Sequence, residues 1–378
     1  MGNRRFRGIN SGVVLATMWA LASVSPLQGA TPEQVAAEMS GLEAVGPVDP
    51  PERDPAAHQQ ALGMLPDTGL LLIPESTNDR VMAFDPMTGD LVDADFVPAD
   101  PANLTTPIHA ILSADGASIL VSDQTGDVVQ QYDLAGNHLG IFAPAGGADP
   151  TILDNIRGIA LRPNGNLLVT VGSGANDDAV AEFDTAGAFL GNFVANGAGG
   201  LDSPFDVFER ASGTFLVGGI TSDTVHEFDA AGAPLPDFAP LDTFPEQIYE
   251  TPSGNILIGN FSGTQEGVVE LDSGGGLVGV YDPPSLGGYR GAYELPNGNI
   301  LTTNGGGVHE IDRGGNLVET KIAGVSARFI EFVGGSDPGV PVVEIPTLST
   351  WGLVAMLLAL ASLGFVAVRR LTLPEEHR

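Results

Sequence analysis

The chain has 378 residues, 51 of them Gly and 28 Pro, with 6% aromatic residues and a formal net charge of −32 at pH 7. Gly and Pro at this frequency favour tight turns and short strands over long helices, and 43% hydrophobic residues suffice for a substantial core. The negative charge argues against a nucleic-acid partner, and the absence of cysteine excludes disulfides, thiolate metal sites and a cysteine nucleophile.

Residues 1–30 have the layout of a secretory signal peptide. Three arginines precede an apolar run of about 15 residues, and Ala30 offers a small residue for cleavage. An uncleaved N-terminal membrane anchor is the alternative. Residues 31–60 are rich in Pro, Ala and acidic residues, and we expect them to form a disordered or loosely packed linker.

Residues 61–333 contain an internal repeat. An apolar residue followed by Asp, and then by Gly three or four residues later, recurs six times. The interval is about 40 to 50 residues, the size of a four-stranded propeller blade. The aspartates of this motif are Asp85, Asp133, Asp184, Asp229, Asp272 and Asp312.

Within each repeat, turns such as "RPNGN" lead into β-favouring runs such as "LLVTV", a pattern typical of antiparallel hairpins. The sequence therefore predicts an all-β fold, a six-bladed β-propeller of four-stranded antiparallel blades, with seven blades as the alternative. The final run, "ARFIEFV" at residues 327–333, is expected to pair with the blade begun near Leu70 and close the ring. A competing opening strand is "ALGML" at residues 61–65.

The segment from Asn155 to Phe193 has the order Gly, strand, polar-Gly turn, second strand, third strand ending in aromatic-Asp, and Gly. This order resembles the NHL family of propellers and, more loosely, the gluconolactonase-like six-bladed group. Other positions that fit the NHL pattern are Pro107, Pro204, Pro245, Gly158 and Gly291. The resemblance implies the fold, and a propeller fold by itself implies no activity.

Opening strands line the central channel of a propeller, so residues seven or eight positions before the turn glycines are the candidates for ligand binding. The channel-binding candidates are His109, Arg157, Asp206, Glu246, Arg290 and Arg328. Because guanidinium groups bind carboxylates in a bidentate manner, the three arginines favour an anionic or zwitterionic ligand. Alternatively, these residues pair with one another around a water-filled channel.

The resemblance to gluconolactonase-like enzymes implies a divalent cation held by oxygen ligands in the channel. Only Asp206, Glu246 and Gln247 are suitable donors there, and they are weak metal candidates. The acidic turns at residues 122–127 and 174–178 could also take up Ca²⁺, but neither follows the EF-hand pattern, and we expect solvated turns. We predict no catalytic or cofactor-binding residue, and possible Ca²⁺ is the only cofactor considered.

Residues 334–344 form a Pro/Gly spacer before an apolar segment. Residues 351–368 carry no charge and would form a helix about 27 Å long, close to the thickness of the bilayer core. By the positive-inside rule, the arginine pair that follows would stay in the cytoplasm. The sequence therefore predicts a transmembrane helix with the propeller on the outer side.

Residues 345–378 resemble the IPTL-CTERM protein-sorting signal of Gram-negative bacteria. The positions that carry the resemblance are Ile345, Pro346, Thr347, Leu348, Trp351, Gly352, Arg369 and Arg370. The resemblance implies an exosortase-type membrane peptidase as a partner. It also implies an inner-membrane intermediate with a cytoplasmic C-terminus, followed by delivery to the cell surface or extracellular matrix. A plain tail anchor is the alternative.

Together these features predict an exported propeller of the cell envelope that acts as a binding or scaffold module for an unknown protein or small-molecule ligand. The alternative is a divalent-metal-dependent lactonase or esterase of the gluconolactonase-like type, which would use the same channel.

Overall fold

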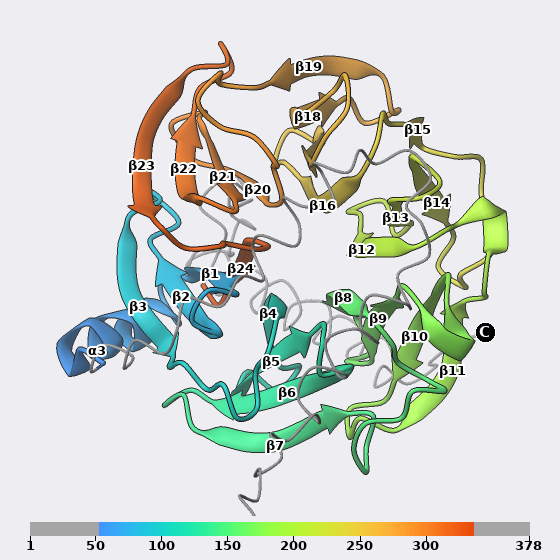
Figure 1. Cartoon of the computed structure of the whole chain (residues 1–378), viewed down its shortest axis with the longest axis horizontal. Coiled ribbons are helices and arrows are strands. Elements are labelled where there is room, and N and C mark those ends of the chain that lie inside the picture. Colours follow the sequence, from blue (N-terminus) through green and yellow to red (C-terminus); the bar gives the residue numbers. More distant parts are fainter. Residues whose placement is uncertain (1–52, 336–378) are drawn as a thin grey trace, which may run out of the picture. The chain divides into compact units, whose positions relative to one another are not determined.

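Short apolar runs bounded by Gly, Asn and Asp form the strands of this protein, because turns recur too often for long helices. The computed structural model describes residues 53–335, which fold into six four-stranded sheets arranged around a central axis (Figure 1). Every strand pair within these sheets is antiparallel. The prediction of a six-bladed propeller is thereby confirmed, and the alternative of seven blades is wrong.

The sheets are named blades 1 to 6, and the strands of each blade are given in order from the channel outward. Blade 1 is β24 (Glu331–Val333), β1 (Leu70–Glu75), β2 (Arg80–Phe84) and β3 (Leu91–Val97); blade 2 is β4 (Pro107–Leu112), β5 (Ser118–Asp123), β6 (Val128–Asp133) and β7 (His138–Ala143); blade 3 is β8 (Ile156–Leu161), β9 (Leu167–Val171), β10 (Ala179–Phe183) and β11 (Phe189–Val194).

The second half of the ring has the same order. Blade 4 is β12 (Pro204–Glu209), β13 (Phe215–Gly219), β14 (Thr224–Phe228) and β15 (Ala239–Pro240); blade 5 is β16 (Pro245–Glu250), β17 (Ile256–Asn260), β18 (Gly267–Leu271) and β19 (Leu277–Tyr281); blade 6 is β20 (Ala292–Glu294), β21 (Ile300–Asn304), β22 (Gly307–Ile311) and β23 (Leu317–Ala323). The helices are α3 (Pro55–Met64) and the short 3-10 turns η1 (Gly174–Asn176) and η2 (Ala198–Gly200).

The ring closes in blade 1, where the last strand of the propeller pairs with the first. In β24, Glu331, Phe332 and Val333 pair with Leu72, Leu71 and Leu70 of β1. This pairing confirms the prediction that the 327–333 run closes the ring on the blade begun near Leu70. The pairing replaces an exposed strand edge with a hydrogen-bonded neighbour.

The helix α3 differs from what the sequence led us to expect. Residues up to 60 were expected to be a loosely packed linker and residues 61–65 a competing strand, but Pro55–Met64 is helical. Asp54 caps the helix by accepting a hydrogen bond from the Ala56 amide. His58 bonds to Asp93 of β3 at 2.9 Å, and Ala61 is fully buried. These contacts with blade 1 stabilise a helix too short to be stable alone.

The repeated Asp and Gly of each blade have separate structural roles, which the turn of blade 3 illustrates. The Asp184 carboxylate accepts hydrogen bonds from the amides of Ala186 and Ala188, each at 2.9 Å. Gly187 has a φ of +77°, and a Cβ there would overlap the carbonyl oxygen of Phe142 at the outer strand of blade 2. The repeat therefore requires Gly both for the turn conformation and for the close contact between blades.

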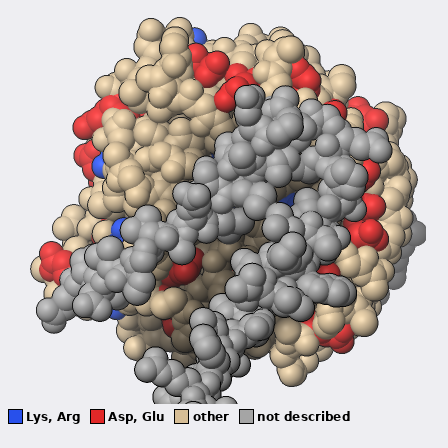
Figure 2. Space-filling model, viewed as in Figure 1, with Lys and Arg blue, Asp and Glu red and all other residues tan. Residues whose placement is uncertain are grey.

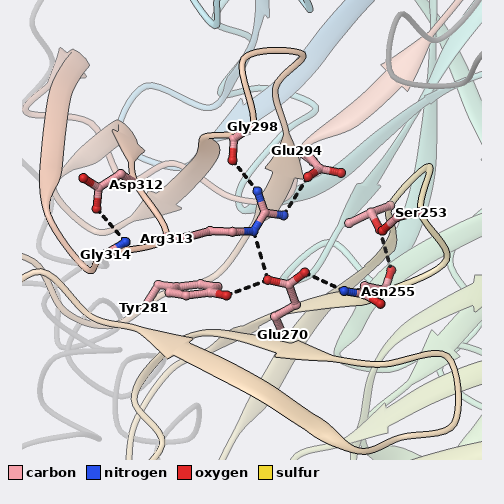
Figure 3. A network of polar contacts seen from close by, with 10 residues as sticks. Ser253, Asn255, Glu270, Tyr281, Glu294, Gly298, Asp312, Arg313 and Gly314 are labelled. Carbon is pink, nitrogen blue, oxygen red and sulfur yellow. Dashed lines mark hydrogen bonds and ion pairs between the residues drawn. The ribbon is translucent and has the colours of Figure 1, made fainter.

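Basic residues tie the blades together. In Figure 3, Arg313 of blade 6 donates to Glu270 of blade 5 at 3.0 Å and to Glu294 of its own blade at 2.7 Å. Similar links between neighbouring blades come from Arg162, Arg210 and Lys321. Acidic side chains predominate over basic ones on the face seen in Figure 2, in keeping with 47 acidic and 15 basic residues in the chain.

Some of the predicted segments lie outside residues 53–335. They are the signal peptide, most of the 31–60 linker, the greater part of the 334–344 spacer, and the C-terminal segment with its transmembrane helix at 351–368. Between residues 53 and 335, no helix combines the length and the apolar composition needed to cross a membrane.

Candidate functional site

The candidate site lies in the central channel, which the innermost strands β24, β4, β8, β12, β16 and β20 surround (Figure 1). A layer of apolar side chains obstructs this channel. Phe205 of blade 4 and Phe329, which precedes β24 of blade 1, come from opposite sides of the ring, and their ring centroids are only 5.8 Å apart. Ile108 belongs to the same buried cluster. This apolar layer separates the two ends of the channel.

The arginines lie at the end of the channel where the innermost strands begin. The Arg157 guanidinium stacks over Phe205 at 4.6 Å and donates to Ser203 Oγ at 3.0 Å and to the Pro204 carbonyl at 2.9 Å. Arg290 donates to Ser326 Oγ at 2.7 Å. These contacts join the start of one blade to the start of the next.

Two other channel candidates also lie near the start of an innermost strand. Arg328 precedes β24 and donates to Ser76 Oγ at 3.1 Å, and Glu246 is completely buried at the start of β16. Four of the six channel candidates therefore lie at or just before the start of an innermost strand. Their role in binding an anionic ligand stays a prediction, since the arginines donate these hydrogen bonds within their own chain.

On the other side of the apolar layer lies a cavity of about 290 Å³. Its polar lining consists of His109, Asp206, Glu209, Gln247 and Glu331. Its apolar walls include Ile159, Phe208 and Phe332. The cavity thus combines carboxylates with hydrophobic surface, which is the usual composition of a small-molecule site.

Asp206 is the central polar group of this cavity and is 2% exposed. Its Oδ2 accepts a hydrogen bond from the Ile248 amide at 2.9 Å, whereas Oδ1 has no hydrogen-bond partner among the described residues. Burial raises the pKa of Asp206 to about 7, although the charge of His109 and backbone hydrogen bonds lower it. Gly158 allows the close approach of Asp206, because a Cβ there would overlap Oδ1.

His109 is fixed between two partners. Its Nδ1 accepts a hydrogen bond from the Ile159 amide at 3.2 Å, and its Nε2 lies 3.2 Å from Glu331 Oε2. The acceptor role of Nδ1 assigns the proton of the neutral ring to Nε2. His109 therefore donates to Glu331 and holds that carboxylate at the cavity.

The weak metal candidates do not form a ligand set. Gln247 Oε1 accepts from the Ile330 amide at 2.9 Å, and its Nε2 donates to the Ile330 carbonyl at 2.6 Å, so its side chain links blade 5 to the closing segment. Glu246 is not among the residues that line the cavity with Asp206. Between residues 53 and 335, no three His, Asp or Glu side chains are grouped so that they could hold a metal ion. The residues present do not fit the divalent cation of gluconolactonase-like enzymes.

The acidic turns considered for Ca²⁺ serve as caps between blades. Asp127 Oδ1 accepts from the Asn155 amide at 2.6 Å, and Asp178 Oδ1 accepts from the Ser203 amide at 2.7 Å. Each carboxylate therefore binds the backbone just before the innermost strand of the next blade. Both turns act in propeller assembly.

Glu331 was missed by the sequence analysis. The candidates were found by counting back seven or eight positions from turn glycines, and Glu331 does not lie at such a position. The available signal was that Glu331 is one of only two polar residues in the otherwise apolar run "ARFIEFV", since a polar residue within a closing strand is expected to face the channel or solvent.

Comparisons with known proteins identify the C-terminal segment and the fold. Residues 345–370 match the IPTL-CTERM motif. Curated protein sequences give no match. The motif indicates an exported or cell-surface protein, in agreement with the resemblance drawn from the sequence.

Solved structures similar to the chain are propellers of low sequence identity. A chain of the nidogen/laminin complex has a TM-score of 0.56 and 14% identity, over 70% of this chain and 98% of that chain. A protein of unknown function from Bacteroides caccae has a TM-score of 0.52 and 17% identity, over 71% and 99%. A gluconolactonase from Xanthomonas campestris has a TM-score of 0.47 and 17% identity, over 68% and 94%. The chain thus joins a six-bladed β-propeller to a C-terminal IPTL-CTERM motif.

Proposed function

We propose that this chain is exported and sorted to the cell surface, where its propeller acts as a binding module for a small organic cation. The observation that carries the proposal is the buried carboxylate of Asp206, whose Oδ1 has no hydrogen-bond partner among the described residues and which lines a cavity of about 290 Å³. A buried polar atom without a partner costs free energy, which a ligand that donates a hydrogen bond would recover.

The charge of the cavity favours a cation. Asp206, Glu209 and Glu331 line it, and it has no lysine or arginine among its lining residues. The apolar walls would contact a hydrocarbon or aromatic body. An ammonium group on such a body would therefore pair with the carboxylates while the body is removed from water.

The metal-dependent lactonase or esterase is less well supported. Its cation would require several oxygen ligands converging on one point, and Gln247 and Asp206 already use oxygen atoms for the backbone amides of Ile330 and Ile248. We therefore derive no catalytic step through a metal in this channel.

Calorimetric titration of the full chain with three matched probes tests the proposal. We expect benzylamine, a cation, to bind at about pH 8, and benzyl alcohol and benzoate to bind at least about 10-fold more weakly, because only the cation pairs with ionised Asp206. The affinity for benzylamine should fall several-fold at about pH 6, because the pKa of Asp206 is about 7.

Asp206→Asn should weaken benzylamine binding about 10-fold and reduce its pH dependence, of which the part due to His109 in the same cavity remains. Asp67→Asn changes an exposed carboxylate outside the cavity and is the matched control. Equal binding of benzylamine and benzoate, or an unchanged affinity in Asp206→Asn, would contradict the proposal.

The sorting part of the proposal concerns the C-terminal segment. Recognition of residues 345–352 by an exosortase-type peptidase, followed by removal of the predicted helix 351–368, is what the motif implies. We expect Pro346→Ala combined with Trp351→Ala to retain the full-length protein in the inner membrane, whereas the wild type is released. Cell fractionation and mass spectrometry of the mature C-terminus measure this, and normal release of the double variant would mean that no peptidase reads the motif.

A further inference from the structure

Blade 4 brings together a serine, a histidine and an aspartate outside the channel cavity. Ser222 lies in the turn between β13 and β14, His226 lies in β14, and Asp237 precedes β15. Ser222 Oγ is 2.8 Å from His226 Nε2, and His226 Nδ1 is 2.8 Å from Asp237 Oδ1. None of the three residues lines the cavity of about 290 Å³.

The atoms involved define the direction in which a proton can move. An aspartate on Nδ1 fixes the tautomer in which Nδ1 carries the proton, so Nε2 accepts from the serine hydroxyl. His226 is 3% exposed, which holds the ring in place, while Ser222 is partly exposed. The serine is therefore accessible in part, and its base is held in the interior.

The local fold makes room for this arrangement. A Cβ on Gly219 would overlap Ser222 Oγ, so the serine reaches the histidine only because residue 219 is Gly. Thr224 Oγ1 donates to the Ser222 carbonyl at 2.9 Å and stabilises the turn. The backbone amides of Ser222 and Asp223 donate no backbone hydrogen bond within the described residues.

Blade 6 contains the same histidine position without the nucleophile and the acid. His309 is the third residue of β22, as His226 is of β14. Its Nε2 contacts Asn304 Oδ1 at 3.1 Å and its Nδ1 contacts Thr320 Oγ1 at 3.0 Å. The blade thus accommodates a buried histidine with neutral amide and hydroxyl partners. A serine and a carboxylate are not required for packing.

We propose that Ser222, His226 and Asp237 form a second, hydrolytic site that cleaves carboxylic esters. Ser222 Oγ forms a bond to the ester carbonyl carbon as its proton passes to His226 Nε2; the bond to the alcohol oxygen then breaks, and the alcohol leaves with that proton. Water attacks the acyl-serine, gives its proton to Nε2, and releases the acid as Ser222 regains the proton. Asp237 stabilises the imidazolium in both steps.

The surroundings limit the substrate to neutral or cationic esters. Asp223 follows Ser222 in the sequence, and Asp237 is the acid of the triad. Their negative charges would repel an ester that carries an anionic group. This proposal is independent of cation binding in the channel, because the two sites share no residue.

Covalent labelling of the full chain with a fluorophosphonate probe, together with hydrolysis of p-nitrophenyl acetate, tests the proposal. We expect mass spectrometry to find the phosphonyl group on Ser222. Ser222→Ala should abolish labelling and lower kcat/KM at least about 100-fold, and Asp237→Asn should lower it at least about 10-fold. Neither position is deeply buried, so both variants are expected to fold.

His309→Ala is the matched control for His226→Ala, because both remove a buried histidine from the third strand of a blade. We expect only His226→Ala to abolish hydrolysis and labelling, even where both variants lower the melting temperature. The proposal is overturned if a serine hydrolase used as a positive control is labelled while Ser222 is not, or if Ser222→Ala hydrolyses the ester at the wild-type rate.

Discussion

Gly187→Ala is expected to destabilise the propeller by about 3 to 5 kcal/mol, the range in which strain and overpacking combine. The positive φ of +77° accounts for about 1 kcal/mol of this loss. The remainder arises because the new Cβ would overlap the Phe142 carbonyl, so blades 2 and 3 must separate. The free energy of unfolding is measured by urea denaturation, with circular dichroism as the signal.

Gly254→Ala provides the control for this prediction. Gly254 has a similar φ of +86°, but a Cβ there would meet no atom within 4 Å. We expect a loss of only about 1 kcal/mol, from the backbone conformation alone. If the two variants lose the same stability, the contact between blades is not what selects Gly in the repeat.

Arg313→Met is expected to destabilise the protein by about 2 to 4 kcal/mol, because it leaves the buried carboxylate of Glu270 without its cation. The Glu270 side chain is 5% exposed and that of Arg313 is 29% exposed. Asn255 and Tyr281 also donate to Glu270 (Figure 3), and we expect both hydrogen bonds to persist in the variant. Methionine retains part of the volume of the arginine side chain, so the loss measures mainly charge and hydrogen bonding.

The pH dependence of this loss follows from the pKa of Glu270. Burial would raise that pKa, but hydrogen bonds from Asn255, Tyr281 and Arg313 outweigh it and hold it below its ordinary value. The stability that ionised Glu270 contributes is therefore present above the ordinary carboxyl pKa and is lost as pH falls through the lowered one. We expect the difference between wild type and Arg313→Met to be largest near pH 7 and to shrink below about pH 4.

A double-mutant cycle separates the charge from other effects of the substitution. In a Glu270→Gln background, Arg313→Met should cost at least about 1 kcal/mol less than in the wild type, because the glutamine leaves no buried charge. An equal cost in both backgrounds would show that the link from Arg313 to Glu294, and not Glu270, dominates.

The blade architecture could be predicted because its determinants are local. Asp184 caps amides two and four residues away, and Gly187 adopts a turn conformation that other residues avoid. Each blade repeats this chemistry, so the number of repeats gave the number of blades. Ring closure was also predictable, since the 327–333 run had the pattern of an opening strand and no blade after it.

The channel could be predicted only in part, because its character depends on which side chains meet across the axis. The sequence placed His109, Arg157 and Asp206 in one channel. The contact between Phe205 and Phe329 divides that channel, and this contact joins residues more than a hundred positions apart in the sequence. Glu331 lines the cavity because β24 pairs with β1 where the ring closes.

The sequence by itself determined the fold, the number of blades, the closing strand and the C-terminal sorting motif, because each is marked by a pattern of residues close together along the chain. Tertiary structure alone decided that Asp206, Glu209 and Glu331 line one cavity and that no arginine lines it with them. It alone brought Asp237 to His226, eleven residues away, since that contact depends on how the segment before β15 folds back over blade 4. Local patterns specify strands and turns, whereas a site forms where side chains from separate elements meet.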